Sequence, residues 1–108
     1  MTTFDDRERG FESKFARDEE MAFRILARRN RLVGEWAARQ MGLTQVEAEA
    51  YAKDVIRADF EEAGEEDVVR KLLGDLTAAG VDIDDLRIRE ALAHKEVEAR
   101  RQLLEARE

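Results

Sequence analysis

One helix ends and another begins within residues 41–47, MGLTQVE. Gly42 follows an apolar-periodic stretch, the place where helices commonly end in a left-handed residue that glycine adopts without steric cost. Thr44 and Glu47 then have the spacing of a capping box, in which the threonine hydroxyl accepts from a free backbone N–H and the glutamate reaches back to the cap. The sequence therefore predicts a short turn between two helices.

The same kind of boundary recurs twice further along the chain. Gly64 and Gly80 each follow an apolar-periodic stretch, and both are followed by acidic residues, which the positive end of a helix dipole favours. The chain contains no proline, so no residue interrupts a helix from within. We therefore expect four helices, at about residues 18–41, 45–62, 66–79 and 84–106.

Each expected helix carries an apolar stripe at helical spacing. In the first helix this stripe consists of Ala22, Ile25, Leu26, Leu32, Val33, Trp36 and Ala37. The connections are only a few residues long, so successive helices should lie antiparallel. The expected fold class is all-α, a four-helix up-down bundle of residues 19–108 preceded by a mobile N-terminal arm of residues 1–18.

The N-terminal arm has an aromatic pattern of its own. Phe4, Phe11 and Phe15 are three of the chain's five phenylalanines, in a stretch otherwise dominated by charged residues. At ~100° per residue, a helix brings these three rings to within about 40° of one another, in phase with Ala22. A charged segment that cannot bury much surface is typical of a chain that orders only when it binds a partner. The alternative is one more packed or frayed turn, with incidental phenylalanines.

The composition excludes most classes of enzyme. Among 108 residues there is no cysteine, one histidine, His94, and one serine, Ser13. One copy therefore has no cysteine nucleophile and cannot assemble a thiolate or His-rich zinc site. The net charge of −7 does not suit nucleic acid, whose phosphates need a basic surface. We expect a protein that is not an enzyme, with no catalytic residue, no cofactor and no metal, and that binds no nucleic acid.

The chain carries no sequence signal for a membrane. No apolar run approaches the ~18 residues that span a bilayer. The N-terminus is acidic where a signal peptide is basic. We expect no direct membrane insertion and a cytoplasmic location.

Arginines cluster in the middle of the first expected helix. Arg24, Arg28 and Arg31 fall on its polar face, whereas Arg29 falls near the centre of the apolar stripe. With Trp36 as a stacking surface, the three polar-face arginines form a candidate site for weak binding of nucleotide phosphates. The alternative is that all four pair with the surplus of carboxylates, with Arg29 meeting an acid between helices. We favour pairing, because no Gly-rich phosphate loop accompanies the arginines.

Two further clusters are weaker candidates for metal binding. Residues 59–67 are dense in carboxylates, but they lack the alternating ligand spacing of a calcium loop. A helix–turn–helix corner explains them better. His94 lies four residues from Glu90 and from Glu98, where a solvated helix surface is far more common than a metal site.

Several blocks of the sequence resemble one known family. The blocks are residues 2–8, TTFDDRE, residues 27–37, ARRNRLVGEWA, and residues 59–62, DFEE, followed by residues 66–68, EDV. They resemble the zeta subunit of alphaproteobacterial F1Fo-ATP synthases, and the resemblance covers nearly the whole chain. It implies a four-helix bundle with a mobile N-terminal arm, which inhibits ATP hydrolysis by the F1 sector.

The resemblance also implies where inhibition takes place. The N-terminal segment of such proteins forms a helix that wedges between a catalytic alpha/beta interface and the central gamma subunit, so that hydrolytic rotation is blocked. The inhibitor is then peripheral to the inner membrane through F1. The matching inhibitory segment of this chain contains Phe4, Arg7, Glu8, Phe11, Lys14 and Phe15. Two other functions stay open from the residues, a nucleotide-binding regulatory bundle and a helical adaptor for another complex.

Overall fold

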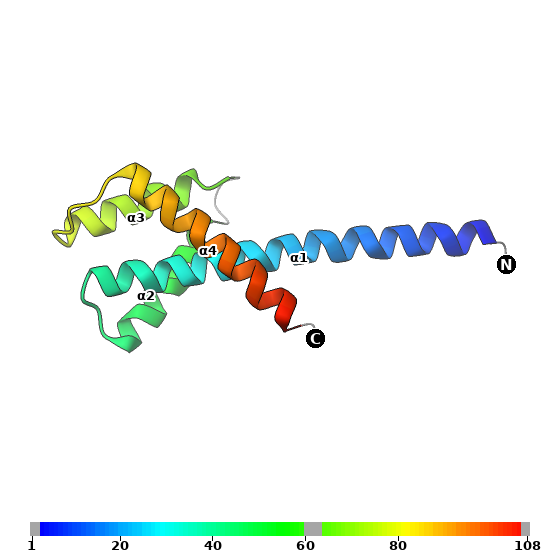
Figure 1. The fold of residues 1–108 in the computed structure, drawn as a ribbon, viewed down its shortest axis with the longest axis horizontal. Coiled ribbons are helices and arrows are strands. Elements are labelled where there is room, and N and C mark those ends of the chain that lie inside the picture. Colours follow the sequence, from blue (N-terminus) through cyan, green and yellow to red (C-terminus); the bar gives the residue numbers. More distant parts are fainter. Residues whose placement is uncertain (1–2, 60–63, 107–108) are drawn as a thin grey trace.

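The computed structural model consists of helices joined by short connections. The structure describes residues 3–59 and 64–106, with side chains from residue 19 onward, and these ranges contain no strand. The helices are α1 (Thr3–Gln40), α2 (Gln45–Ala58), α3 (Glu66–Ala78) and α4 (Asp85–Glu105). Figure 1 shows α2, α3 and α4 gathered around the C-terminal half of α1, while the N-terminal half extends beyond them. This is the all-α, four-helix fold that the sequence predicts.

Helix α1 is longer than the sequence analysis expects. It starts at Thr3 rather than near residue 18 and continues to Gln40. Gly10 costs a helix only about 1 kcal/mol relative to alanine, and no proline is present to break the helix, so the helical register continues through the arm. The sequence also predicts that residues 1–18 are mobile. Residues 1 and 2 and the side chains of residues 3–18 lie outside the described part of the chain. The division into arm and bundle therefore stays a prediction.

The predicted glycine boundaries are present after α1 and after α3. Gly42 and Gly80 have φ angles of +75° and +84°, in the left-handed region that glycine adopts easily. The next residues, Leu43 and Val81, donate their backbone N–H groups to the carbonyl five residues earlier, at 3.0 Å and 2.9 Å. This Schellman arrangement satisfies the last carbonyl groups of both helices and turns the chain back toward the bundle.

Side-chain caps begin α2 and α4. The Thr44 hydroxyl accepts from the Glu47 backbone N–H at 3.2 Å, and the Glu47 carboxylate accepts from the Thr44 backbone N–H at 2.9 Å. The predicted capping box is thus confirmed. At α4 the Asp84 carboxylate accepts from the Arg87 backbone N–H at 2.9 Å.

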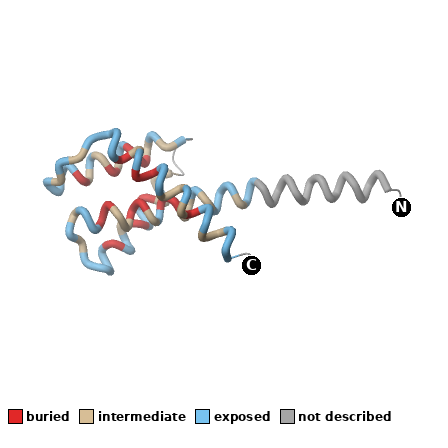
Figure 2. The backbone as a smooth tube through the Cα atoms, in the orientation of Figure 1, coloured by how far each residue is buried: buried red, intermediate tan, exposed pale blue. Residues whose placement is uncertain are grey.

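The core lies between the C-terminal half of α1 and the other three helices (Figure 2). Its largest fully buried apolar side chains are Val33, Val55, Val68, Leu72, Leu76, Ile88 and Leu92. Buried alanines of α1, α2 and α4 lie between them, so the core is thin. Ala22 and Leu26 belong to the predicted apolar stripe but are exposed. Another helix does not cover them, because α1 is already leaving the bundle at that point.

Helices α1 and α2 approach each other most closely at Gly34. A Cβ atom added at this position would lie 2.8 Å from Cα of Ala52 and 3.3 Å from Cγ2 of Val55. Because the nearer atom is backbone, a side chain at position 34 requires the two helices to move apart. The glycine therefore sets the distance between α1 and α2.

This contact predicts opposite effects for two glycine substitutions. Gly34→Ala should lower the free energy of unfolding by about 2 kcal/mol, since the core would be overpacked. Gly74→Ala is the matched control, because an added Cβ on α3 meets no atom within 4 Å. It should raise the free energy of unfolding by up to about 1 kcal/mol through helix propensity alone. Thermal unfolding followed by circular dichroism tests both, and equal shifts for the two variants would contradict the close approach.

Candidate functional site

The residues predicted to bind F1 all lie in the projecting half of α1. They are Phe4, Arg7, Glu8, Phe11, Lys14 and Phe15, and their side chains lie outside the described part of the structure. Because the backbone is helical throughout, positions 4, 11 and 15 keep the helical phase that places them on one face. That phase leads into the described residues at positions 22 and 26.

Where α1 leaves the bundle, its apolar side chains line a groove against α4. The groove has a volume of about 340 Å³ and is lined by Met21, Ala22, Ile25, Leu26, Glu96 and Arg100. Ala22 is exposed, Leu26 is 38% exposed, and Met21 and Ile25 are half-buried. Helix α4 crosses α1 near this point (Figure 1), and its residues Glu96 and Arg100 form the other side of the groove. The apolar stripe of α1 is therefore accessible from the arm to the edge of the bundle.

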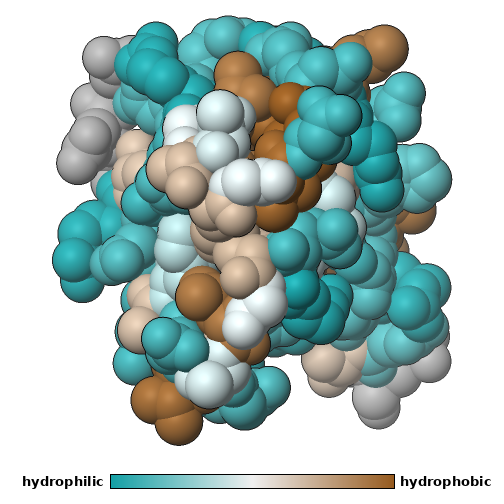
Figure 3. All heavy atoms as spheres, turned by 90° about the vertical axis from the view of Figure 1, so that its left-hand side faces the viewer, coloured by the Kyte–Doolittle hydropathy of each residue, from teal (hydrophilic) through white to brown (hydrophobic). Residues whose placement is uncertain are grey.

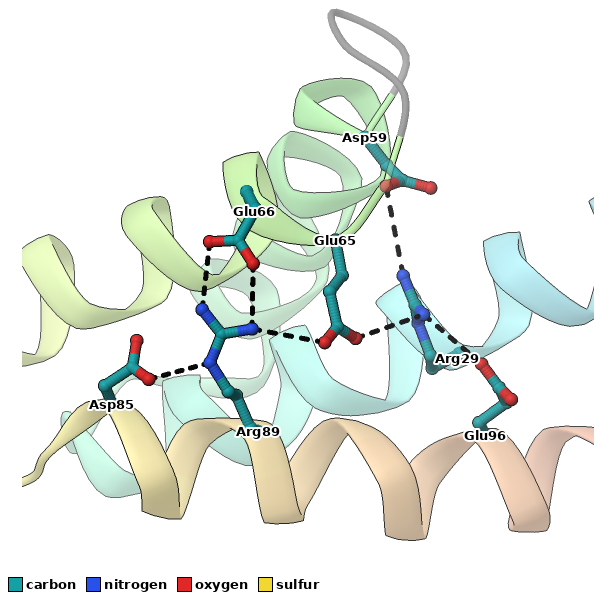
Figure 4. A network of polar contacts seen from close by, with 7 residues as sticks. All are labelled: Arg29, Asp59, Glu65, Glu66, Asp85, Arg89 and Glu96. Carbon is teal, nitrogen blue, oxygen red and sulfur yellow. Dashed lines mark hydrogen bonds and ion pairs between the residues drawn. The ribbon is translucent and has the colours of Figure 1, made fainter.

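Glu96 of this groove also belongs to a network of ion pairs around a buried arginine. The side chain of Arg29 is 6% exposed and faces three carboxylates (Figure 4). Its Nη1 lies 3.3 Å from Glu96 Oε1 in α4 and 3.9 Å from Glu65 Oε2 before α3, and its Nη2 lies 3.9 Å from Asp59 Oδ1 after α2. Its Nε donates to the Oδ1 of buried Asn30 at 3.0 Å. As predicted, the arginine within the apolar stripe meets acids between helices.

A second arginine extends the network along α4. Both Oε atoms of Glu66 accept from the Arg89 guanidinium at 2.9 Å, and Asp85 accepts from its Nε at 2.7 Å (Figure 4). Glu65 lies 3.3 Å from Arg89 and thus joins the two guanidinium groups. The hydrogen bond from Arg89 lowers the pKa of Glu66 below its ordinary value, and the guanidinium charge adds to this effect. Hydrogen bonds to Glu66 and Asp85 raise the pKa of Arg89 in return.

The carboxylates of residues 59–67 therefore serve the corner between α2 and α3. Asp59, Glu65 and Glu66 bind arginines of α1 and α4, and Asp67 pairs with Arg70 at 3.2 Å. Residues 60–63 of this run lie outside the described residues. Where the run is described, its charges hold helix ends together.

The arginines predicted to bind nucleotide phosphate each have a protein partner. Arg24 pairs with a glutamate one turn earlier at 2.7 Å, and Arg31 pairs with a glutamate one turn later at 3.2 Å. Arg28 donates to a glutamine side chain of α4 at 2.9 Å. The face of Trp36 lies 5.3 Å from the guanidinium of Arg87. A phosphate at these arginines would have to displace their partners, and the nucleotide site stays a prediction.

The sequence analysis did not single out Glu96 of α4, which pairs with Arg29 and lines the groove. Glu96 lies four residues after Leu92 and three before Ala99, both of them buried, so it falls on the apolar stripe of its helix. Arg29 has the same kind of position in α1. Two opposite charges, each within an apolar stripe, are a recognisable sequence signal for a pair between helices.

Comparison with known proteins identifies the family. A family model described as ATPase inhibitor subunit zeta matches residues 1–102. The chain belongs to this family. A protein solved by solution NMR is 43% identical, with a TM-score of 0.71 over 80% of this chain and 98% of the other. No curated protein matches the chain.

Membership gives this zeta-family chain a role as an ATPase inhibitor and implies an F1 ATPase as its partner. Within the residues that the structure describes, no helix combines the length and the apolar content needed to cross a membrane.

The Arg29 network predicts a large effect for one substitution. Arg29→Met leaves Asp59 and Glu96 without their buried cation, and the free energy of unfolding should fall by about 2 kcal/mol. Arg101→Met is the matched control, because Arg101 and Glu105 form an exposed pair, and it should change stability by less than ~0.5 kcal/mol. Urea unfolding at neutral pH measures both. An Arg29→Met variant as stable as the wild type would show that the network does not hold the helices.

The lowered pKa of Glu66 predicts the direction of a pH effect. Since its pKa is lower in the folded chain, its pairing with Arg89 contributes stability that is fully present above the unfolded value of about 4.3 and is lost as the pH falls through the folded value. The melting temperature of the wild type should therefore fall more steeply between about pH 5 and pH 3 than that of Glu66→Gln. Thermal unfolding at constant ionic strength measures both slopes. Parallel curves would contradict the pairing.

Proposed function

We propose that this chain inhibits ATP hydrolysis by the F1 sector of ATP synthase through residues 1–18. In this proposal the arm inserts as a helix between a catalytic alpha/beta interface and the gamma subunit. Hydrolysis requires that interface to open and close as the central subunit turns, so a helix held there blocks rotation. The chain acts by occupying a site and not by chemistry, so it is not an enzyme. Through F1 it sits peripheral to the inner membrane.

The observation that carries the proposal is the division of α1 between core and projection. At 1.5 Å per residue, its 38 residues make a helix of about 57 Å, close to the 64 Å length of the whole molecule. Among the described side chains, every buried one belongs to residue 29 or a later residue. The described core is therefore built from residue 29 onward, and the backbone of α1 projects away from it toward its N-terminus (Figure 1).

The composition of the arm fits insertion into a cleft. Each phenylalanine at positions 4, 11 and 15 removes roughly 150–250 Å² from water when buried, at ~25 cal/mol per Å² before ordering costs. Acidic and basic residues such as Arg7, Glu8 and Lys14 are interleaved with these rings. Interleaved charges set the register and the partner more than the affinity.

Inhibition of purified F1 tests the proposal. Deletion of residues 1–18 should abolish inhibition of ATP hydrolysis, while circular dichroism shows that the bundle stays folded. Phe11→Ala combined with Phe15→Ala should raise the half-inhibitory concentration at least tenfold, because a buried aromatic anchor typically contributes more than ~1 kcal/mol. Leu86→Ala, an exposed apolar residue at the start of α4, is the control and should change it less than twofold. Undiminished inhibition by the truncated chain would show that the arm is not the inhibitory segment.

A further inference from the structure

We infer that the F1-binding surface continues from the arm onto the bundle, where it includes the groove between α1 and the C-terminal part of α4. This inference rests on the proposed function. The occupant of the groove is an apolar segment of F1, next to the surface that receives the arm, with a carboxylate at its edge. In this inference the bundle contacts F1 directly and does not only hold the arm in place.

The face of α1 that contains the phenylalanine positions continues as far as the groove. Positions 22 and 26 follow positions 11 and 15 by eleven residues each, which is three turns and about 17 Å along a helix. Because α1 has no break between Thr3 and Gln40, the two pairs of positions lie on the same face. A partner that lies along the face with Phe11 and Phe15 is therefore led to Ala22 and Leu26.

The apolar side chains of the groove are accessible to a partner. Ala22 and Leu26 continue the stripe that forms the core further along α1, yet here they are exposed. Single exposed apolar residues are common, and Val46 at the start of α2 is one of them. The groove differs from such single residues because four apolar side chains of α1 line it together and a second helix forms its wall. Figure 3 shows the opposite end of the molecule, where apolar side chains appear in separate patches among polar ones.

The polar wall of the groove defines the chemistry of its occupant. Arg100 is 60% exposed and lies 3.6 Å from Glu96, whose carboxylate also pairs with buried Arg29 at 3.3 Å. Glu96 is thus shared by two arginines, and the exposed Arg100 lines the groove. An apolar segment with one carboxylate at its edge fits this arrangement, because its charge would complete the pairing of Arg100.

Single cysteines test the inference directly, because the native chain has none. Ala22→Cys and Arg100→Cys place thiols on the two walls of the groove. Two matched controls lie outside the groove. They are His94→Cys, at an exposed position on another face of α4, and Val46→Cys, at a position where the native valine is 77% exposed. The alkylation rate of each full-length variant by a maleimide is measured alone and with saturating F1. We expect F1 to slow alkylation at least tenfold at positions 22 and 100, and less than twofold at positions 94 and 46.

The outcomes separate this inference from the proposed function. If the wild-type chain does not inhibit F1, the proposed function is wrong and the inference is wrong with it. If the wild type inhibits but alkylation at position 100 is not slowed, the inference is wrong and the proposed function stands, whether or not position 22 is protected. Equal slowing at all four positions would mean that F1 covers the bundle without selecting the groove, which would also overturn the inference.

Discussion

A buried guanidinium must have its charge matched, and this requirement at Arg29 organises the bundle. Its carboxylate partners come from the end of α2, the start of α3 and the middle of α4, so all four helices meet at one side chain. The apolar core is thin and rich in alanine, and small side chains pack almost as well in several registers. If α1 slid by a turn, Arg29 would be buried without its partners, at a cost of several kcal/mol. Charge pairing therefore selects one register where apolar packing alone is weakly selective.

The same network marks the end of the bundle along α1. Arg29 and Asn30 are the first buried residues of α1 among the described side chains, and before them the helix is exposed or half-buried. Glu96, which pairs with Arg29 on one side, lines the groove on the other. The ion pairs of Arg29 therefore lie at the point where α1 leaves the bundle. Loss of the network would loosen the base of the arm as well as the corner between α2 and α3.

Local chemistry made the turns after α1 and α3 and the start of α2 predictable. The start of α1 at Thr3 and the tertiary contacts were harder to predict. Gly42 and the Thr44 cap act within a few residues of chain, so the sequence alone locates the turn between α1 and α2. Periodicity places Ala22 and Leu26 on an apolar stripe, but it does not show whether another helix lies opposite, and here none covers them. Among the partners of Arg29, Glu96 has a local signal in its place on an apolar stripe, whereas Asp59 and Glu65 depend on how the four helices meet. The proposed role of the arm rests on the aromatic phase and the family resemblance together.

A single apolar stripe on α1 can serve two sets of partners because the helix is continuous. An isolated helix of some 16 residues is marginal in water, since forming its first turn fixes several residues for one hydrogen bond. In α1 the C-terminal half is already helical through its packing at Val33 and Ala37, so the arm extends an existing helix without a new nucleus. In the proposed complex, a partner that binds the arm needs to stabilise only the propagation of the helix, so more of the binding energy of the phenylalanines would remain for affinity. The packed half of α1 therefore lowers the conformational cost of binding through the other half.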